Sequence, residues 1–155
     1  MRLNLTRQAD HAVRAMVYLA GQPPGERRKA AEIAAATAIP AAFAARVLAQ
    51  LQRAGLLLAR AGHDGGYTLA RPASRVSLLE VIEAMEGPIQ ARTCLMRDQL
   101  CGQESHCVLH GAWSAAQTAL REVLAATPLS VAGRPTFDVP SKEEAANGHS
   151  VPSAA

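Results

Sequence analysis

The apolar positions at the start of the chain recur at helical spacing. An apolar stripe runs through residues 6–20 and consists of Ala9, Ala12, Val13, Met16 and Ala20. Thr6 has the hydroxyl group that caps many helices, and Gly21 is suited to end one. We therefore predict a first helix over residues 6–20.

Residues 29–54 contain a second apolar pattern, which predicts two short helices with a tight break between them. The first is expected over residues 29–37 with Ile33 turned inward, and the second over residues 40–54. The predicted buried face of the second helix consists of Phe43, Val47, Leu48 and Leu51. Its opposite face carries small residues and arginines, namely Ala42, Ala45, Arg46, Ala49 and Arg53. This pair is typical of a helix-turn-helix that enters the major groove of DNA, although an ordinary helix pair in an alanine-rich bundle shares the pattern.

A β-hairpin is predicted directly after these helices. Residues 56–60 favour a strand, residues 61–66 are rich in turn formers, and residues 67–69 favour a returning strand. A hairpin in this position is a wing, whose glycines permit close backbone approach and whose cations reach phosphates or a minor groove. A plain surface hairpin is the alternative, but the order of helices and hairpin favours DNA binding. The candidate DNA-binding residues are Arg2, Arg28, Ala42, Arg46, Arg53, Arg60, His63, Gly65 and Gly66.

Two more helices are predicted in the second half of the chain. Ser77-Leu78-Leu79-Glu80 has the form of a capping box and opens a helix over residues 77–86. A long helix is expected over residues 108–126, and its apolar side consists of Leu109, Ala112, Trp113, Ala116, Leu120, Val123 and Leu124. This helix lies outside the winged unit, and two-fold proteins match two-fold operators, so we interpret it as a dimerisation helix. Packing on its own domain is the alternative.

The composition narrows the class of protein. Apolar residues make up 49% of the 155 residues but aromatic residues only 3%, which favours a helical core of Ala, Leu and Val. The net charge of +3 is a weak hint of a nucleic-acid partner. No run of about 18 apolar residues is present, so no membrane span is expected, and the polar start favours a cytoplasmic protein. Residues 134–155 are rich in Pro, Ser and charge, which predicts a disordered tail.

All the cysteines lie in one short segment, Cys94 to His110, with the spacing C-x6-C-x5-C-x2-H. In a reducing cytoplasm an odd number of thiols does not build a disulfide framework, so a metal site is the stronger hypothesis. Thiolates select zinc, copper(I) or iron–sulfur clusters, and the wide gaps favour a cluster over zinc, whose sites usually have closer cysteine pairs. A metal-free thiol switch and three unrelated cysteines are the other interpretations. No oxyanion or phosphate-loop motif accompanies the thiols, so an enzyme is not expected.

Several stretches, taken in order, resemble a known family. They are ADHAVRAM in the first helix, LQRAGLL after the helix-turn-helix, GGYTLARPASRVSLLEVIEAMEG, and three cysteines before a long helix. Together they are similar to the Rrf-type winged-helix transcriptional regulators, which include the iron–sulfur regulator IscR and the nitric-oxide sensor NsrR. The resemblance covers residues 1–133. It implies a homodimer that binds a pseudo-palindromic DNA operator and holds a [2Fe-2S] cluster, or in the nitric-oxide branch a [4Fe-4S] cluster, on Cys94, Cys101 and Cys107.

The resemblance implies two candidates for the fourth cluster ligand. In the IscR-like branch it is a histidine three residues after the third cysteine, which corresponds to His110. In the NsrR-like branch it is an aspartate of the other subunit's first helix, which corresponds to Asp10. We favour His110, because its i, i+3 relation to Cys107 supplies the geometry locally. The sequence departs from the IscR-like pattern by a longer first cysteine gap, by Ala45 in place of a glutamate and by His11 in place of a common tyrosine.

We therefore expect a mainly α-helical winged helix-turn-helix with a small hairpin wing and a long C-terminal dimerisation helix. The expected organisation is a DNA-binding domain over residues 1–88, a cysteine-rich cluster-binding loop over 89–110, a dimerisation helix region over 108–133 and a tail over 134–155. The expected function is a DNA-binding transcriptional regulator, a repressor, whose operator affinity is controlled by an iron–sulfur cluster that senses iron or cluster status, redox state or nitric oxide. A winged-helix regulator with structural zinc or a metal-free thiol switch is the alternative, followed by a cluster-bearing redox protein.

Overall fold

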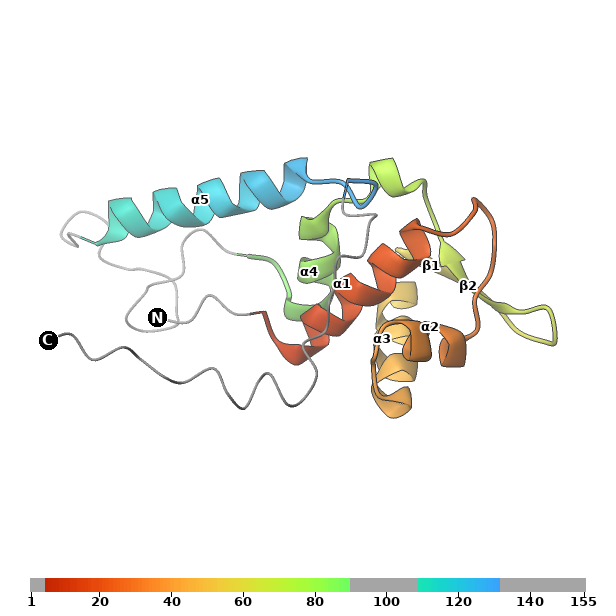
Figure 1. Cartoon of the computed structure of the whole chain (residues 1–155). Helices are drawn as coiled ribbons and strands as arrows, with labels where there is room; N and C mark the ends of the chain where they lie inside the picture. The colour runs from red at the N-terminus through yellow and green to blue at the C-terminus, as the bar shows by residue number, and fades with distance from the viewer. Residues whose placement is uncertain (1–4, 90–108, 132–155) are drawn as a thin grey trace, which may run out of the picture.

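Five α-helices and one β-hairpin make up the described part of the chain (Figure 1). The computed structural model describes residues 5–89 and 109–131, and the predicted tail lies outside them. The elements are, in order, α1 (Arg7–Ala20), α2 (Ala30–Ala36), α3 (Ala41–Arg53), β1 (Leu57–Arg60), β2 (Gly66–Leu69), the 3-10 helix η1 (Ala73–Arg75), α4 (Leu78–Glu86) and α5 (His110–Ala126). The predicted fold class, a winged helix-turn-helix with a small hairpin and a long C-terminal helix, is confirmed.

Local capping groups set the ends of α1 and α4, as the sequence predicts. The Thr6 hydroxyl accepts a hydrogen bond from the Ala9 amide at 3.2 Å, and Gly21 follows the last turn of α1. At α4, the Ser77 hydroxyl accepts from the Glu80 amide at 3.3 Å, and the Glu80 carboxylate accepts from the Ser77 amide at 2.9 Å. These reciprocal bonds satisfy amides that the first turn of a helix leaves without an internal partner.

The break between α2 and α3 has the geometry of a helix-turn-helix. The two helices are bent by 114°, and Ala38 at the break has a φ of 54°, in the left-handed region that non-glycine residues rarely adopt. Pro40 is the N-cap of α3, and Gly55, with a φ of 73°, follows its end. No single helix among the described residues is long and apolar enough to cross a membrane. By length and composition alone, α2 and α3 pass that test only when taken together across the bend.

The buried face of α3 differs from the prediction at one position. Ala44, Val47, Leu48 and Leu51 are buried, whereas Phe43 is 50% exposed. The buried residues follow the i, i+3, i+4, i+7 pattern of a helix face, and Phe43 falls one position before it. The prediction of Phe43 as a core residue is therefore wrong, because the small side chain of Ala44 takes the place where α3 packs against its neighbours.

The hairpin is fixed to the helix-turn-helix through its second strand. β1 and β2 pair antiparallel, from Leu57 opposite Leu69 to Arg60 opposite Gly66. On the other side of β2, the Tyr67 amide donates to the Arg28 carbonyl at 2.8 Å, and the Arg28 amide donates to the Tyr67 carbonyl at 3.0 Å. The loop before α2 thus forms a short third partner of the sheet, which sets the helix-turn-helix against the wing.

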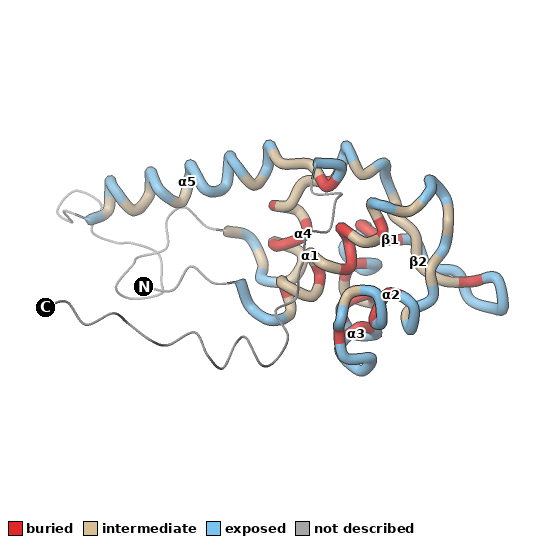
Figure 2. The backbone as a smooth tube through the Cα atoms, in the orientation of Figure 1, coloured by how far each residue is buried: buried red, intermediate tan, exposed pale blue. Residues whose placement is uncertain are grey.

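The core lies between α1, α3, α4 and β1, where most of the buried residues gather (Figure 2). None of the residues of α5 is buried, and this helix starts away from the hairpin and runs back to η1 (Figure 1). Directly after α5 the chain enters the core through Leu129, which is fully buried. The Leu78 amide donates to the Thr127 carbonyl, and the Leu129 amide to the Val76 carbonyl, each at 2.9 Å. The end of α5 is thereby fastened to the start of α4, a contact that the sequence analysis did not predict.

Candidate nucleic-acid interface and cofactor segment

The outward face of α3 combines small side chains with two arginines. Ala42, Ala45, Arg46 and Arg53 are exposed, and Ala49 between them is half-buried. The Arg53 Nε lies 3.4 Å from the Ala49 carbonyl oxygen, while Arg46 forms no ion pair with any described residue. Small side chains allow a helix backbone to approach a partner closely, and a guanidinium group is a donor that suits phosphates and guanine.

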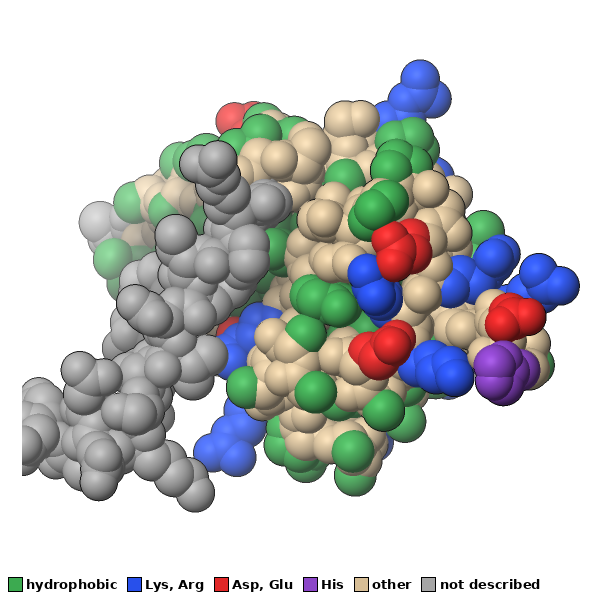
Figure 3. Space-filling model, turned by 45° about the vertical axis from the view of Figure 1, so that its right-hand side comes forward, with side chains coloured by type: hydrophobic (Ala, Val, Ile, Leu, Met, Phe, Trp, Pro, Cys, Tyr) green, Lys and Arg blue, Asp and Glu red, His purple; other side chains and the backbone are tan. Residues whose placement is uncertain are grey.

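The hairpin beside α3 carries exposed basic groups. Arg60 ends β1 and is exposed, and His63 at the tip is 97% exposed, with its Nδ1 3.2 Å from the Asp64 carboxylate. Figure 3 shows Lys and Arg side chains on the hairpin side of the molecule, with acidic groups among them. The surface therefore offers separate cationic groups for contacts with phosphates rather than one continuous basic field.

The two candidate glycines are required by the hairpin itself. A Cβ on Gly65 would lie 2.2 Å from the Arg60 carbonyl oxygen, and a Cβ on Gly66 would lie 2.6 Å from the Arg28 carbonyl oxygen. Gly66 also has a φ of 139°, a conformation that side chains disfavour. Both glycines thus shape the tip that presents Arg60 and His63.

Arg28 is bound by neighbouring side chains. Its guanidinium group donates to the Gln22 side-chain oxygen at 2.7 and 3.0 Å and pairs with the Glu26 carboxylate at 2.6 Å. Together with the backbone pairing to Tyr67, these contacts give Arg28 a role in holding the loop between α1 and α2. Arg2, the other candidate near the start of the chain, lies outside the described residues.

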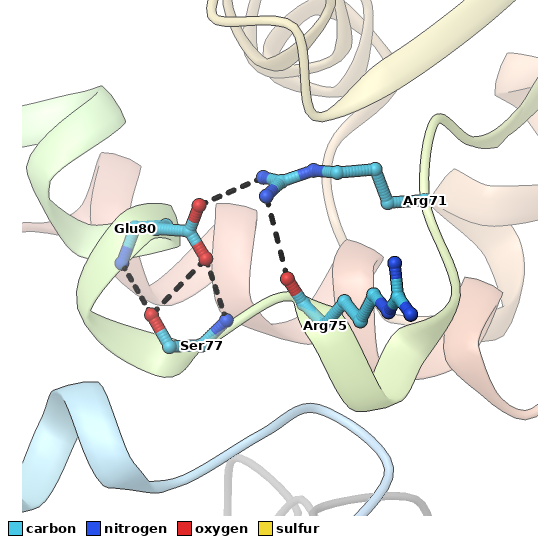
Figure 4. A network of polar contacts seen from close by, with 4 residues as sticks. All are labelled: Arg71, Arg75, Ser77 and Glu80. Atoms are coloured by element: carbon cyan, nitrogen blue, oxygen red, sulfur yellow. Dashed lines mark hydrogen bonds and ion pairs between the residues drawn. The ribbon is translucent and has the colours of Figure 1, made fainter.

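A polar network ties the exit of the hairpin to α4 (Figure 4). The Arg71 Nη2 lies 2.7 Å from the Glu80 carboxylate, and its Nη1 donates to the Arg75 carbonyl at 3.3 Å. Partial burial acts to raise the pKa of Glu80, but the hydrogen bonds from Ser77 and Arg71 and the charge of Arg71 outweigh it. The pKa of Glu80 therefore lies below its ordinary value. The S-x-x-E motif signalled the Ser77 contact, but no local signal identified Arg71 as a partner.

The three cysteines of the candidate cofactor site, Cys94, Cys101 and Cys107, lie outside the described residues. His110 is the first residue of α5 and its side chain is half-buried. Its predicted helical relation to Cys107 is untested, because Cys107 lies outside the described residues. Within the ranges that the structure describes, no three His, Cys, Asp or Glu side chains gather into a metal-binding group.

Asp10, the second candidate for the fourth ligand, is bound by a cation on its own helix. The Arg14 guanidinium contacts both carboxylate oxygens, with Nε 3.0 Å from Oδ1 and Nη2 2.9 Å from Oδ2. The Nδ1 of His11 lies 3.8 Å from Oδ2. Both oxygens of the Asp10 carboxylate therefore lie beside a positive charge, which offsets the negative charge that would attract a metal ion.

Glu83 connects the chain before the cysteine segment to α5. Its Oε1 accepts a hydrogen bond from the Ile89 amide at 3.0 Å and lies 3.4 Å from the Arg121 Nε. Ile89 is the last described residue before the cysteines, and Arg121 lies on α5. Sequence reasoning missed this contact, because Arg121 lies 38 residues from Glu83 and no motif joins them.

Comparison with known proteins assigns most of the chain to one family. Residues 5–132 match the family model Rrf2, which is described as an iron-dependent transcriptional regulator. A Mycobacterium tuberculosis protein that bears the name of an HTH-type transcriptional regulator is 33% identical over 132 residues, which cover 84% of this chain and 82% of that protein. Protein aau3 of Rhizobium meliloti is 34% identical over 124 residues, 79% of each chain.

Solved structures share the fold of this chain. CymR, the global cysteine regulator of B. subtilis, superposes with a TM-score of 0.70 at 21% identity, over 85% of this chain and 97% of CymR. IscR of T. potens superposes with a TM-score of 0.65 at 21% identity, over 97% of this chain and 94% of IscR. At these identities the likeness shows the fold alone, whereas the family match extends through the sequence from α1 to the end of α5. The chain belongs to the Rrf2 family of DNA-binding transcriptional regulators.

Proposed function

We propose that this protein is a cytoplasmic, homodimeric repressor that binds a pseudo-palindromic operator and adjusts its affinity through an iron–sulfur cluster. The observation that carries the DNA-binding half is the exposed face of small residues and arginines on α3, beside the hairpin. The cluster half is supported by the three thiols within one short segment and by the iron-dependent description of the family.

The proposed DNA contacts follow from the exposed groups of α3 and the hairpin. Ala42 allows α3 to enter the major groove, where Arg46 and Arg53 donate to guanine edges or phosphates. Arg60 and His63 reach phosphates or the minor groove from the hairpin. The remaining candidates are proposed to add contacts with phosphates or to shape the hairpin, namely Arg2, Arg28, Gly65 and Gly66.

A second copy of the chain is the proposed partner of α5. Leu109, the N-cap of α5, is 48% exposed, and Leu120 and Val123 are 44% and 63% exposed; by helical spacing all three fall on one side of this helix. Exposed apolar side chains gathered on one face mark an interaction surface. A two-fold dimer covers the same face on both copies and places two recognition helices on two operator half-sites.

Cys94, Cys101, Cys107 and His110 form the proposed ligand set. Three thiolates and an imidazole suit an iron–sulfur cluster, for which [2Fe-2S] is favoured and [4Fe-4S] is the alternative. When bound, the cluster supplies a centre that oxidants, nitric oxide or iron shortage can alter. We favour His110 over Asp10, because the Arg14 guanidinium pairs with both oxygens of the Asp10 carboxylate and offsets its negative charge.

Two contacts at opposite ends of α4 support a coupling between this segment and the hairpin. Near its C-terminus, Glu83 holds Ile89 at the start of the cysteine segment. In its first turn, Glu80 holds Arg71 at the exit of the hairpin. A displacement of the cysteine segment is therefore transmitted through one short helix to the wing. A coupling of about 1–3 kcal/mol changes operator affinity by about 5- to 150-fold.

Binding of the cluster-loaded and cluster-free proteins to one operator tests the proposal. The operator is selected from a random duplex library, and affinity is measured by fluorescence anisotropy at one salt concentration, because affinity for DNA depends strongly on salt. We expect the two forms to differ by about 5- to 150-fold. The triple variant Cys94→Ser, Cys101→Ser, Cys107→Ser is expected to bind like the cluster-free form. Equal affinity of the two forms would sink the sensing proposal while leaving DNA binding intact.

Metal analysis separates the proposal from its alternatives. Iron and sulfide in coloured, anaerobically purified protein support the cluster, whereas zinc in colourless protein supports a structural site. A metal-free protein whose DNA binding responds to oxidants would be a thiol switch, the second candidate. For the fourth ligand, His110→Ala is expected to lower the cluster content and Asp10→Ala to leave it unchanged.

A further inference from the structure

Phe43, near the start of α3, is an exposed aromatic side chain with one ring of α1 beside it. It is 50% exposed, and its ring centroid lies 6.0 Å from that of His11 on α1, with the ring planes at 60°. The His11 side chain is itself only 14% exposed. Because aromatic rings at this distance attract each other, His11 supports one side of the Phe43 ring while the other side stays open to solvent. Core packing does not account for the open side.

The exposed part of Phe43 adjoins the outward face of α3. Ala42 and Phe43 lie four and three positions before Arg46, so each side chain neighbours Arg46 on the helix surface. Ala42 and Ala45 are exposed and have no side-chain donor or acceptor. The start of α3 therefore presents an apolar surface with one guanidinium group beside it. In a helix-turn-helix, the first residues of the second helix are the ones that approach the base edges.

We propose that Phe43, together with Ala42 and Ala45, contacts thymine methyl groups in each operator half-site, next to a guanine bound by Arg46. The thymine C5-methyl is the apolar group that base pairs display in the major groove, and guanine is the base that arginine binds in a bidentate manner. The inference rests on the proposed function, because it takes α3 as the recognition helix. It adds the chemical class of the operator, in which thymines adjoin the guanine that faces the start of α3.

Replacing thymine by deoxyuridine tests the contact, because it removes only the methyl group. The operator is first selected from a random duplex library with the full-length protein, and thymines of one half-site are then exchanged singly. We expect at least one exchange to weaken binding of the wild-type protein about fourfold, the effect of losing one buried methyl group. Phe43→Ala is expected to bind the thymine operator more weakly and to lose its sensitivity to that exchange. Phe43→Leu, which keeps an apolar side chain, is expected to retain part of it.

Three results would overturn the inference in distinguishable ways. Enrichment of an operator whose binding is indifferent to every thymine exchange would refute the methyl contact alone. Unchanged sensitivity in Phe43→Ala would remove Phe43 from the contact. Failure of the wild-type protein to enrich any sequence would refute the proposed function and this inference with it. Circular dichroism of both Phe43 variants establishes that any weaker binding belongs to folded protein.

Discussion

Arg71, two residues after the end of β2, pairs at 2.7 Å with Glu80 in the first turn of α4. Glu80 also closes the capping box with Ser77. The Glu80 carboxylate thus both caps α4 and binds the segment that follows the wing (Figure 4). Because both charged side chains are partly exposed, the cap contributes more to stability than the ion pair does.

Replacing Glu80 separates the cap from the charge. Glu80→Ala removes both and is expected to lower the free energy of unfolding by about 1–2 kcal/mol. Glu80→Gln keeps a side chain that can close the capping box, so its expected loss is about 0.5 kcal/mol. Urea unfolding at pH 7 measures both, with Glu122→Gln on α5 as the matched control. Equal losses in Glu80→Ala and Glu80→Gln would contradict the primary role of the cap.

The charge of Glu80 also predicts a pH dependence. Its pKa lies below the ordinary value of 4.5, so the folded state binds a proton more weakly at this site than the unfolded state does. The resulting stability is fully present above pH 4.5 and is lost as the pH falls through the lowered pKa of the folded state. The stability difference between wild type and Glu80→Gln is therefore expected to shrink below pH 4.5. A difference that stays constant down to pH 2.5 would exclude this titration.

Gly66 is expected to resist substitution more than another glycine of the same hairpin. A Cβ on Gly66 meets the Arg28 carbonyl oxygen at 2.6 Å, whereas a Cβ on Gly62 meets nothing within 4 Å, although both have a positive φ. Gly62→Ala adds only the backbone strain, about 1 kcal/mol, and Gly66→Ala adds the clash to it, for a total of at least about 2 kcal/mol. Thermal unfolding compares the two variants, and similar melting temperatures would argue against a rigid pairing of Arg28 with β2.

The parts of the fold that follow from sequence are those with local causes. Thr6 and Ser77 cap the predicted helices because their hydroxyl groups act on amides three residues away. Phe43 was misplaced because the spacing of α3 fits two faces that differ by one position, and packing on other helices chose Ala44. Leu129 was missed because a single leucine after a helix carries no periodic signal, and only the tertiary contact with Val76 gives it a place in the core.

The candidate site also contains features with local causes and features that depend on tertiary contacts. The exposure of Arg46 and Arg53 was predictable from helical spacing, because both fall opposite the buried stripe. The engagement of Arg28 by Gln22 and Glu26 was not predictable, because it depends on how the loop between α1 and α2 folds back. The pairing of Asp10 with Arg14, by contrast, has a local cause, because the two residues lie four positions apart on α1.

Gln50 is expected to fix the orientation of α3 relative to α1 and α4. Its side-chain oxygen accepts a hydrogen bond from the Gln8 amide group on α1, and its own amide group donates to the Ala84 carbonyl on α4 at 2.9 Å. Gln50→Ala removes both of these hydrogen bonds and is expected to lower the free energy of unfolding by about 1–2 kcal/mol. The exposed Gln52→Ala on the same helix is the control, with an expected change within about 0.5 kcal/mol. Chemical denaturation measures the free energy of unfolding of both variants. Equal effects would mean that the Gln50 hydrogen bonds to α1 and α4 do not contribute to stability.

The return of the chain after α5 is expected to be essential for the stability of the winged domain. Leu129 is fully buried, so Leu129→Ala opens a cavity in the core and should cost about 2–5 kcal/mol. Val131, two residues further along, is 75% exposed, and Val131→Ala is expected to change stability by less than about 0.5 kcal/mol. Urea unfolding at fixed protein concentration measures this difference, and its dependence on concentration shows whether association contributes. If Leu129→Ala unfolded at the same urea concentration as Val131→Ala, the segment after α5 would not contribute to the stability of the winged domain. The expected large difference would instead show that the segment after α5 is part of the winged domain. The Ser130 amide also attaches this segment to η1, which follows the hairpin, by donating to the Ala73 carbonyl at 3.3 Å.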